Sequence, residues 1–78
     1  MTHEERLARD AMVFAINHDF FGYGSTCKRV GTSTYLSIVD EEKTYYSGMK
    51  LAKEFKKLKK SLQKDIFVEF YENTGVSI

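Results

Sequence analysis

Lysine recurs at helical spacing in the second half of this 78-residue chain. Steps of three, four, three and four residues place five lysines on one stripe of a helix: Lys50, Lys53, Lys57, Lys60 and Lys64. At about 1.5 Å per residue, such a stripe extends roughly 20 Å. Each ammonium group in it can neutralise a phosphate and release a counterion, so the row is suited to a nucleic-acid backbone or another polyanion. Lys56 and Lys59 flank the row and add to its charge.

The same lysines divide the charge of the chain unevenly. The formal net charge is +1, but residues 43–64 hold eight lysines and one acid, Glu54, which gives +7 and leaves −6 for the remainder. A solvated polar face is the commoner meaning of a lysine run, whereas neutral surface helices usually mix both signs. Both interpretations stay open, and lysines would in either case position a ligand without reading bases.

No catalytic or metal-binding set is recognisable. His3 and His18 lie too far apart along one predicted helix to share a metal ion at the usual spacing. Cys27, the single cysteine, is most simply a small apolar thiol on a strand, and His18 a partner of a helix C-terminus. The segment 22–24 has two glycines but lacks the third glycine and the preceding strand of a phosphate-binding loop. We therefore predict neither an enzyme nor a cofactor.

Periodicity and turn signals predict the elements that position these residues. Thr2 followed by Glu5 fits a capping box at the start of a largely apolar helix. A short segment, 44–46, is either a third strand or the first turn of the basic helix, and we favour the strand. The predicted helices are 2–18 and 47–64, and the predicted strands are 25–30, 34–39, 44–46 and 66–71, with a tail at 76–78 that either pairs or frays.

The apolar face of the basic helix predicts how it docks. Leu51, Phe55, Leu58 and Leu62 form a narrow stripe nearly opposite the lysines, and Ser47 is a suitable N-cap. The chain thus predicts one small α+β domain, 1–78, of two layers in the order α-β-β-β-α-β. Two helices would cover one face of an antiparallel sheet of three to four strands.

Other sequence features concern location. No apolar run approaches the roughly 18 residues needed to span a membrane. The two acids Glu4 and Glu5 precede the first apolar stretch, which is the wrong start for a secretory signal. We therefore expect a cytoplasmic protein that does not interact with membranes.

Aromatic side chains on the predicted strands suggest a second surface. The predicted strands contain Tyr35, Tyr45, Phe67 and Tyr71, and some of these would face away from the helices. Exposed aromatic rings on a sheet can stack unpaired bases or form a protein interface. Partial burial within the sheet is the simpler interpretation for any one of them.

The order α-β-β-β-α, with Lys50, Ala52 and Lys53 at the start of the second helix, resembles the double-stranded-RNA-binding domain. That family carries a Lys-Lys-x-Ala-Lys motif after a Gly or Ser turn. The resemblance implies that Lys50 and Lys53 contact phosphates across a groove. This chain has Met49 in place of the first lysine, and its predicted final strand lies beyond the usual end of the family's fold.

Three functional hypotheses follow. The first is a small non-catalytic protein that binds RNA or DNA phosphates through the basic helix. The second is an accessory protein of the kind that phages and mobile elements use to bind and inhibit an acidic host protein, in the style of anti-CRISPR proteins or toxin neutralisers. The third is a homodimer, suggested by the apolar breadth of the first helix and by the exposed edge of the last strand, and it is compatible with either binding role.

Overall fold

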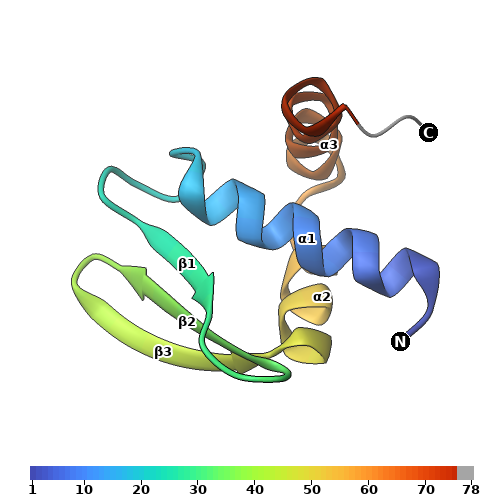
Figure 1. The fold of residues 1–78 in the computed structure, drawn as a ribbon. Helices are drawn as coiled ribbons and strands as arrows, with labels where there is room; N and C mark the ends of the chain where they lie inside the picture. Colours follow the sequence, from blue (N-terminus) through green and yellow to red (C-terminus); the bar gives the residue numbers. More distant parts are fainter. Residues whose placement is uncertain (76–78) are drawn as a thin grey trace.

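Three helices and a three-stranded antiparallel sheet make up residues 1–75, the part of the chain that the computed structural model describes (Figure 1). The predicted tail 76–78 lies outside the described residues. The elements are α1 (His3–Asn17), β1 (Thr26–Arg29), β2 (Thr34–Val39), β3 (Glu42–Ser47), α2 (Gly48–Lys56) and α3 (Lys60–Thr74).

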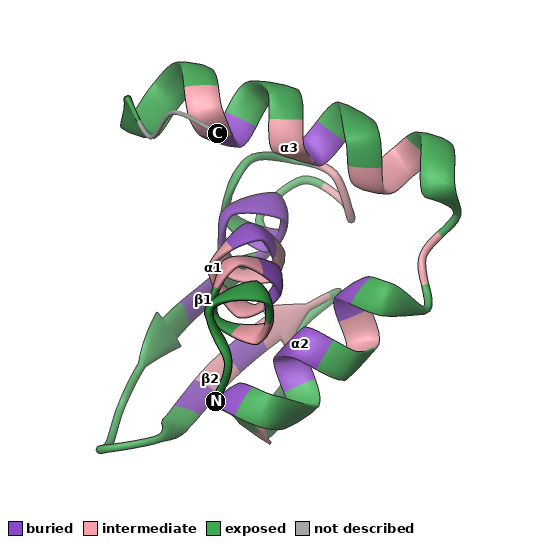
Figure 2. Cartoon of the chain, turned by 90° about the vertical axis from the view of Figure 1, so that its right-hand side faces the viewer, coloured by how far each residue is buried: buried purple, intermediate pink, exposed green. Residues whose placement is uncertain are grey.

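Helix α1 lies at the centre of the fold. It begins at the predicted capping box, where the Thr2 hydroxyl accepts from the Glu5 amide at 3.1 Å and the Glu5 carboxylate accepts from the Thr2 amide at 2.8 Å. Ala8, Ala11 and Ala15 are buried, and such small side chains allow neighbouring elements to approach closely. Figure 2 shows α1 end-on, with α2, α3 and the sheet around it. Its broad apolar surface is therefore covered within the chain.

The sheet has the order β1-β2-β3, and its two faces differ. Side chains alternate across a strand, so Cys27 and Tyr35 face the helices, where they pack in one cluster with Ile16 of α1 and Leu51 of α2. Helices α1 and α2 thus cover the same face, as the sequence predicts. No helix of the described chain packs on the other face, the outer face hereafter, which carries the half-buried Leu36 among others.

Local geometry sets the ends of the strands. Asp40 and Glu41 adopt left-handed backbone angles, with φ of 52° and 68°, as a tight two-residue hairpin between right-twisted strands requires. At the edge of β1, the Asn17 side chain donates to the Cys27 carbonyl at 2.8 Å and accepts from the Cys27 amide at 2.9 Å. The amide side chain of Asn17 therefore pairs with the backbone of Cys27 as a residue of a neighbouring strand would, at this one position of the edge.

The predicted continuous helix 47–64 is wrong, because the chain turns after Lys56. The amide of Leu58 bonds to the carbonyl of Phe55, three residues back, which tightens the last turn. The Gln63 side chain then donates to the Leu58 carbonyl at 2.8 Å and to the Lys56 carbonyl at 3.3 Å. These two bonds satisfy carbonyls at the end of α2, so α3 can start at Lys60 in a new direction.

The predicted strand 66–71 is also wrong, because this segment belongs to α3. Ile66 and Phe70, four residues apart, are both buried, and the ring of Phe70 meets Phe14 of α1 edge-on with centroids 5.6 Å apart. An apolar residue at every second position of 66–71 also gives apolar residues four apart, so the same pattern fits a helix. Gly75, with φ 72°, ends the helix in the left-handed conformation. The α+β class and the order α-β-β-β-α are confirmed, with three strands rather than four and a final helix stacked on α1.

None of the helices in residues 1–75 is both long enough and apolar enough to cross a membrane.

Candidate functional site

The break between α2 and α3 redistributes the predicted lysine row. Three lysines lie on α2, one caps its end, one precedes α3 and two lie in α3; in that order they are Lys50, Lys53, Lys56, Lys57, Lys59, Lys60 and Lys64. All seven are exposed. They are distributed over two helices of different direction and the connection between them, so the straight ridge of about 20 Å expected from the rise of a single helix is not formed.

Ion pairs divide these lysines into two groups. The Glu54 carboxylate lies 3.4 Å from Lys50 Nζ and 3.8 Å from Lys57 Nζ, so both ammonium groups form an ion pair with it. Within the described residues the other five form no ion pair: Lys53, Lys56, Lys59, Lys60 and Lys64. We call these five lysines the basic corner. Most of its charge therefore remains available to a ligand.

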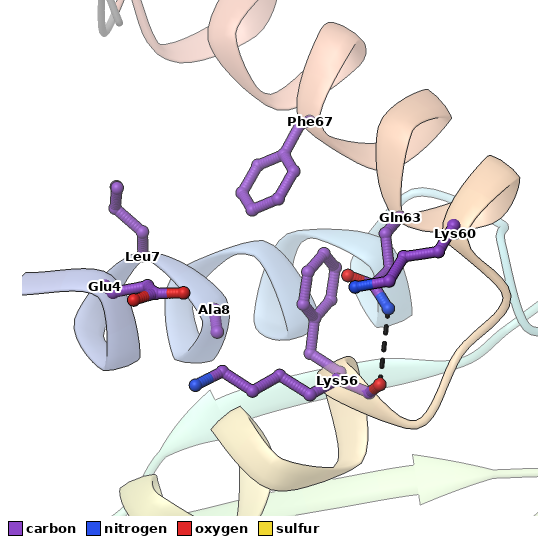
Figure 3. Close-up of a pocket in the computed structure, with 8 residues that line it drawn as sticks. Glu4, Leu7, Ala8, Lys56, Lys60, Gln63 and Phe67 are labelled. Atoms are coloured by element: carbon purple, nitrogen blue, oxygen red, sulfur yellow. Dashed lines mark hydrogen bonds between the residues drawn. The ribbon is translucent and has the colours of Figure 1, made fainter.

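A hollow of about 300 Å³ lies beside the basic corner, between the three helices (Figure 3). Its lining includes Leu7 of α1 and Phe67 of α3, and the Lys56 side chain extends along it toward α1. Glu4 lines the same hollow. Hydrogen bonds from Thr2 lower the pKa of Glu5, and the charge of Lys56 adds to this effect. Lys56 thus lies near the acidic first turn of α1, which offsets part of its charge.

A second hollow, of about 450 Å³, lies on the surface of α3. It shares three of its residues with the first hollow, and its full lining is Lys60, Gln63, Lys64, Phe67, Val68 and Tyr71. The rings of Phe67 and Tyr71 are stacked, with centroids 5.7 Å apart and planes 11° apart. Two lysines and two aromatic residues that the sequence assigns to binding surfaces therefore lie together here, on a helix rather than on a sheet.

The other two predicted aromatic residues do not join this site. Tyr35 is only 7% exposed, because it faces the helices from the central strand, so the prediction that it offers a stacking surface is wrong. Tyr45 is 65% exposed and lies opposite Leu36 on the outer face. Tyr35 and Tyr45 thus lie on opposite faces of the sheet, and these two rings do not form one aromatic surface.

The side chains considered for catalysis are placed elsewhere. Cys27 is buried, and burial raises the pKa of its thiol above the ordinary value, which disfavours the reactive thiolate. The His18 ring stacks on Phe14 and its Nδ1 lies 2.9 Å from the Phe14 carbonyl, in keeping with a role at the helix end. Among residues 1–75 no three histidine, cysteine or acidic side chains are grouped as metal ligands.

Acidic residues gather at a different place in the molecule. Asp40 and Glu41 form the tip of the β2–β3 hairpin, which lies at the left of Figure 1 with the loop that contains Asp19. Helices α2 and α3, with the lysines, lie at a distance from this tip in the same view. The hairpin tip and the lysines thus lie at opposite sides of the molecule, although Asp65, Glu69 and Glu72 lie on α3 itself.

Two residues of the site were not identified from the sequence. Gln63 shapes the turn between the helices, and Val68, 49% exposed, lines the hollow on α3. The signal that identifies both is the spacing of four between Leu62, Ile66 and Phe70, which indicates a helix.

Comparisons of the chain with protein-family models, with curated proteins and with solved structures find no match. The resemblance to the double-stranded-RNA-binding domain stays a prediction. Of the two lysines that it assigns to phosphates, Lys50 pairs with Glu54, and Lys53 forms no ion pair within the described residues. Neither feature that suggested a homodimer is found in residues 1–75, because α1 is covered within the chain and the predicted last strand is a helix.

Proposed function

We propose that this protein is a non-catalytic nucleic-acid-binding protein that contacts the phosphate backbone through the basic corner. The observation that carries the proposal is a set of five lysines without ion pairs in the described chain, at the junction of α2 and α3 and next to stacked aromatic rings. Glu54, the acid on α2, is already shared between Lys50 and Lys57.

Electrostatics supports this choice of ligand. The acidic hairpin tip repels a polyanion while the basic corner attracts it, so the two together orient the approaching strand. Lysines are compact point charges on flexible stems, which suits phosphate contacts that do not depend on sequence. Lys60 and Lys64 should contribute most, because no acid of the described chain lines the hollow that they share.

Fluorescence anisotropy with labelled single-stranded and duplex oligonucleotides at several salt concentrations tests the proposal. The wild type should lose affinity steeply as salt increases. In Lys60→Gln/Lys64→Gln, the slope of log K against log salt should fall by about 0.7 for each single-strand phosphate that the variant no longer neutralises. The control Lys28→Gln/Lys43→Gln makes the same change of net charge on the outer face and should bind like the wild type.

Affinity that does not respond to salt would contradict the proposal. So would equal weakening in the two double variants, because net charge rather than the basic corner would then govern binding.

A second candidate function, a protein that binds and inhibits an acidic host protein, is favoured by the outer face. Leu36 and Ile38 are half-buried there without a covering helix from the described chain, and Tyr45 is exposed beside them. Lys28 and Lys43 lie on the same face, opposite Leu36 and Ile38 in neighbouring strands. An apolar strip with basic neighbours is suited to a partner surface with acidic borders.

Substitutions on the outer face separate this candidate from the first. Tyr45→Asp should abolish capture of a protein partner from a nuclease-treated lysate, while binding of an oligonucleotide to the basic corner is retained. Capture that disappears on nuclease treatment would count against the second candidate.

A further inference from the structure

We infer that the hollow on α3 holds an unpaired base of a single-stranded nucleic acid, stacked on the Phe67–Tyr71 ring pair, while Lys60 and Lys64 contact the adjoining phosphates. This inference rests on the proposed function and names its ligand class.

The ring pair is held in place by the core beneath it. Phe67 meets Phe55 of α2 edge-on with ring centroids 5.0 Å apart, and the ring centroids of Tyr71 and Phe70 are 5.6 Å apart. Both Phe67 and Tyr71 are half-buried, and both line the hollow. Rings fixed in this way lose little conformational entropy when a base stacks on them, and every base has a face that can stack.

The charges around the rings fit a strand. Lys60 and Lys64 are four residues apart on one side of α3, which separates them by about 6 Å along the helix axis. None of the residues that line this hollow in the described chain is acidic. A positively charged groove next to stacking rings is the arrangement by which proteins bind single strands with little sequence preference.

A duplex is a poorer fit for the same surface. Its bases are paired and stacked inside the helix, so none of them can reach Phe67 and Tyr71 without being flipped out, which is energetically unfavourable. The basic corner also bends from α2 into α3. A flexible single strand can follow the bend and present a base to the rings.

Sequence preference should be weak. In the described lining of the hollow, the Gln63 amide and the Tyr71 hydroxyl are the uncharged side-chain groups that can form hydrogen bonds. The Gln63 amide already donates to the carbonyls of Leu58 and Lys56, so it is not free to donate to a base edge. Affinity should follow stacking strength rather than base-pairing pattern.

Four probes of similar charge test the inference by anisotropy or competition: oligo-dT, an abasic phosphodiester strand of the same length, a duplex, and poly-glutamate. Oligo-dT should bind about tenfold more tightly than the abasic strand, as expected for one stacked base. Tyr71→Leu should remove this advantage and leave the affinity for the abasic strand unchanged, while Tyr71→Phe should preserve it. Tyr45→Leu, on the outer face, is the matched control and should bind like the wild type.

The other outcomes distinguish the two levels of the account. Equal affinity for oligo-dT and the abasic strand overturns the stacking inference and leaves phosphate binding intact, as does tighter binding of the duplex. Binding of poly-glutamate at the strength of oligo-dT overturns the inference in favour of an acidic protein. If no nucleic acid binds, both the inference and the proposed function are overturned.

Discussion

Lys60 and Lys64 differ from Lys50 and Lys57 in what surrounds them, although all four carry the same charge. Lys60 and Lys64 border an aromatic hollow, and no acid of the described chain lines it. Lys50 and Lys57 share the carboxylate of Glu54. Exposed ion pairs of this kind contribute little to stability, but they reduce the charge that a ligand meets. The lysine spacing in the sequence could not distinguish the two pairs, because the difference depends on where α2 ends.

The carboxylate of Glu5 makes stability depend on pH. Its hydrogen bonds with Thr2 lower its pKa in the folded state below the ordinary glutamate value. A lowered folded pKa means that the contribution to stability is fully present above the unfolded pKa and is lost as the pH falls through the folded pKa. Glu5→Gln keeps an acceptor for the Thr2 amide but does not titrate, so its urea-unfolding free energy should decline less in acid than that of the wild type.

The control for this prediction is Glu4→Gln, which removes one carboxylate from the same turn and leaves the capping box intact. Its stability should follow the wild-type decline in acid more closely than Glu5→Gln does. Identical acid profiles for Glu5→Gln and the wild type would contradict the role assigned to the cap.

At the scale of elements, the sequence predicted α1, the central strand β2 and the start of α2 because each carries its own signal. These signals are the capping box of Thr2, the β-branched and aromatic run 34–39, and the N-cap Ser47, whose hydroxyl accepts from the Lys50 amide at 3.1 Å. The turn into α3 carries no such local signal. Neither glycine nor proline marks it, and the side-chain bonds that stabilise it come from Gln63, further along the chain.

Substitutions in 66–71 test whether this segment is a helix or the strand that its alternating pattern predicts. On a strand, Ile66 and Val68 would share a face, whereas on α3 Ile66 is fully buried and Val68 is 49% exposed. Ile66→Ala should therefore lower the unfolding free energy by about 3 kcal/mol, and Val68→Ala should change it by less than about 0.5 kcal/mol. Urea unfolding measures both, and similar decreases at the two positions would contradict the helix.

The Gln63 side chain should stabilise the turn between α2 and α3 more than it stabilises α3 itself. Gln63→Ala removes the two bonds to the carbonyls of Leu58 and Lys56, so we expect the unfolding free energy to fall by about 1 kcal/mol. Trypsin should also cleave the native protein faster after Lys57 or Lys59. The control is Lys64→Ala, one residue further along, which should leave the cleavage rate at the turn unchanged; equal rates in the two variants would argue against this role for Gln63.

For the whole molecule, the sequence predicted a charge asymmetry and the fold gives it a direction. The lysines of α2 and α3 lie away from the acidic tip formed by Asp40 and Glu41. The aromatic residues could not be assigned in the same way. Tyr35 and Tyr45 both occur in strands, and only the register shows that the first faces the core and the second faces outward. Phe67 and Tyr71 line the hollow together because their segment is a helix.

The most direct test of binding at the basic corner is a titration of the ¹⁵N-labelled protein with oligo-dT, followed by amide chemical shifts. The account predicts saturable shifts concentrated in residues 56–72, around Lys60, Lys64 and Tyr71, which diminish as salt is raised. The amides of Lys28 and Tyr45 on the outer face should stay unchanged. Shifts concentrated on the outer face, or none at any protein-to-strand ratio, would contradict the account.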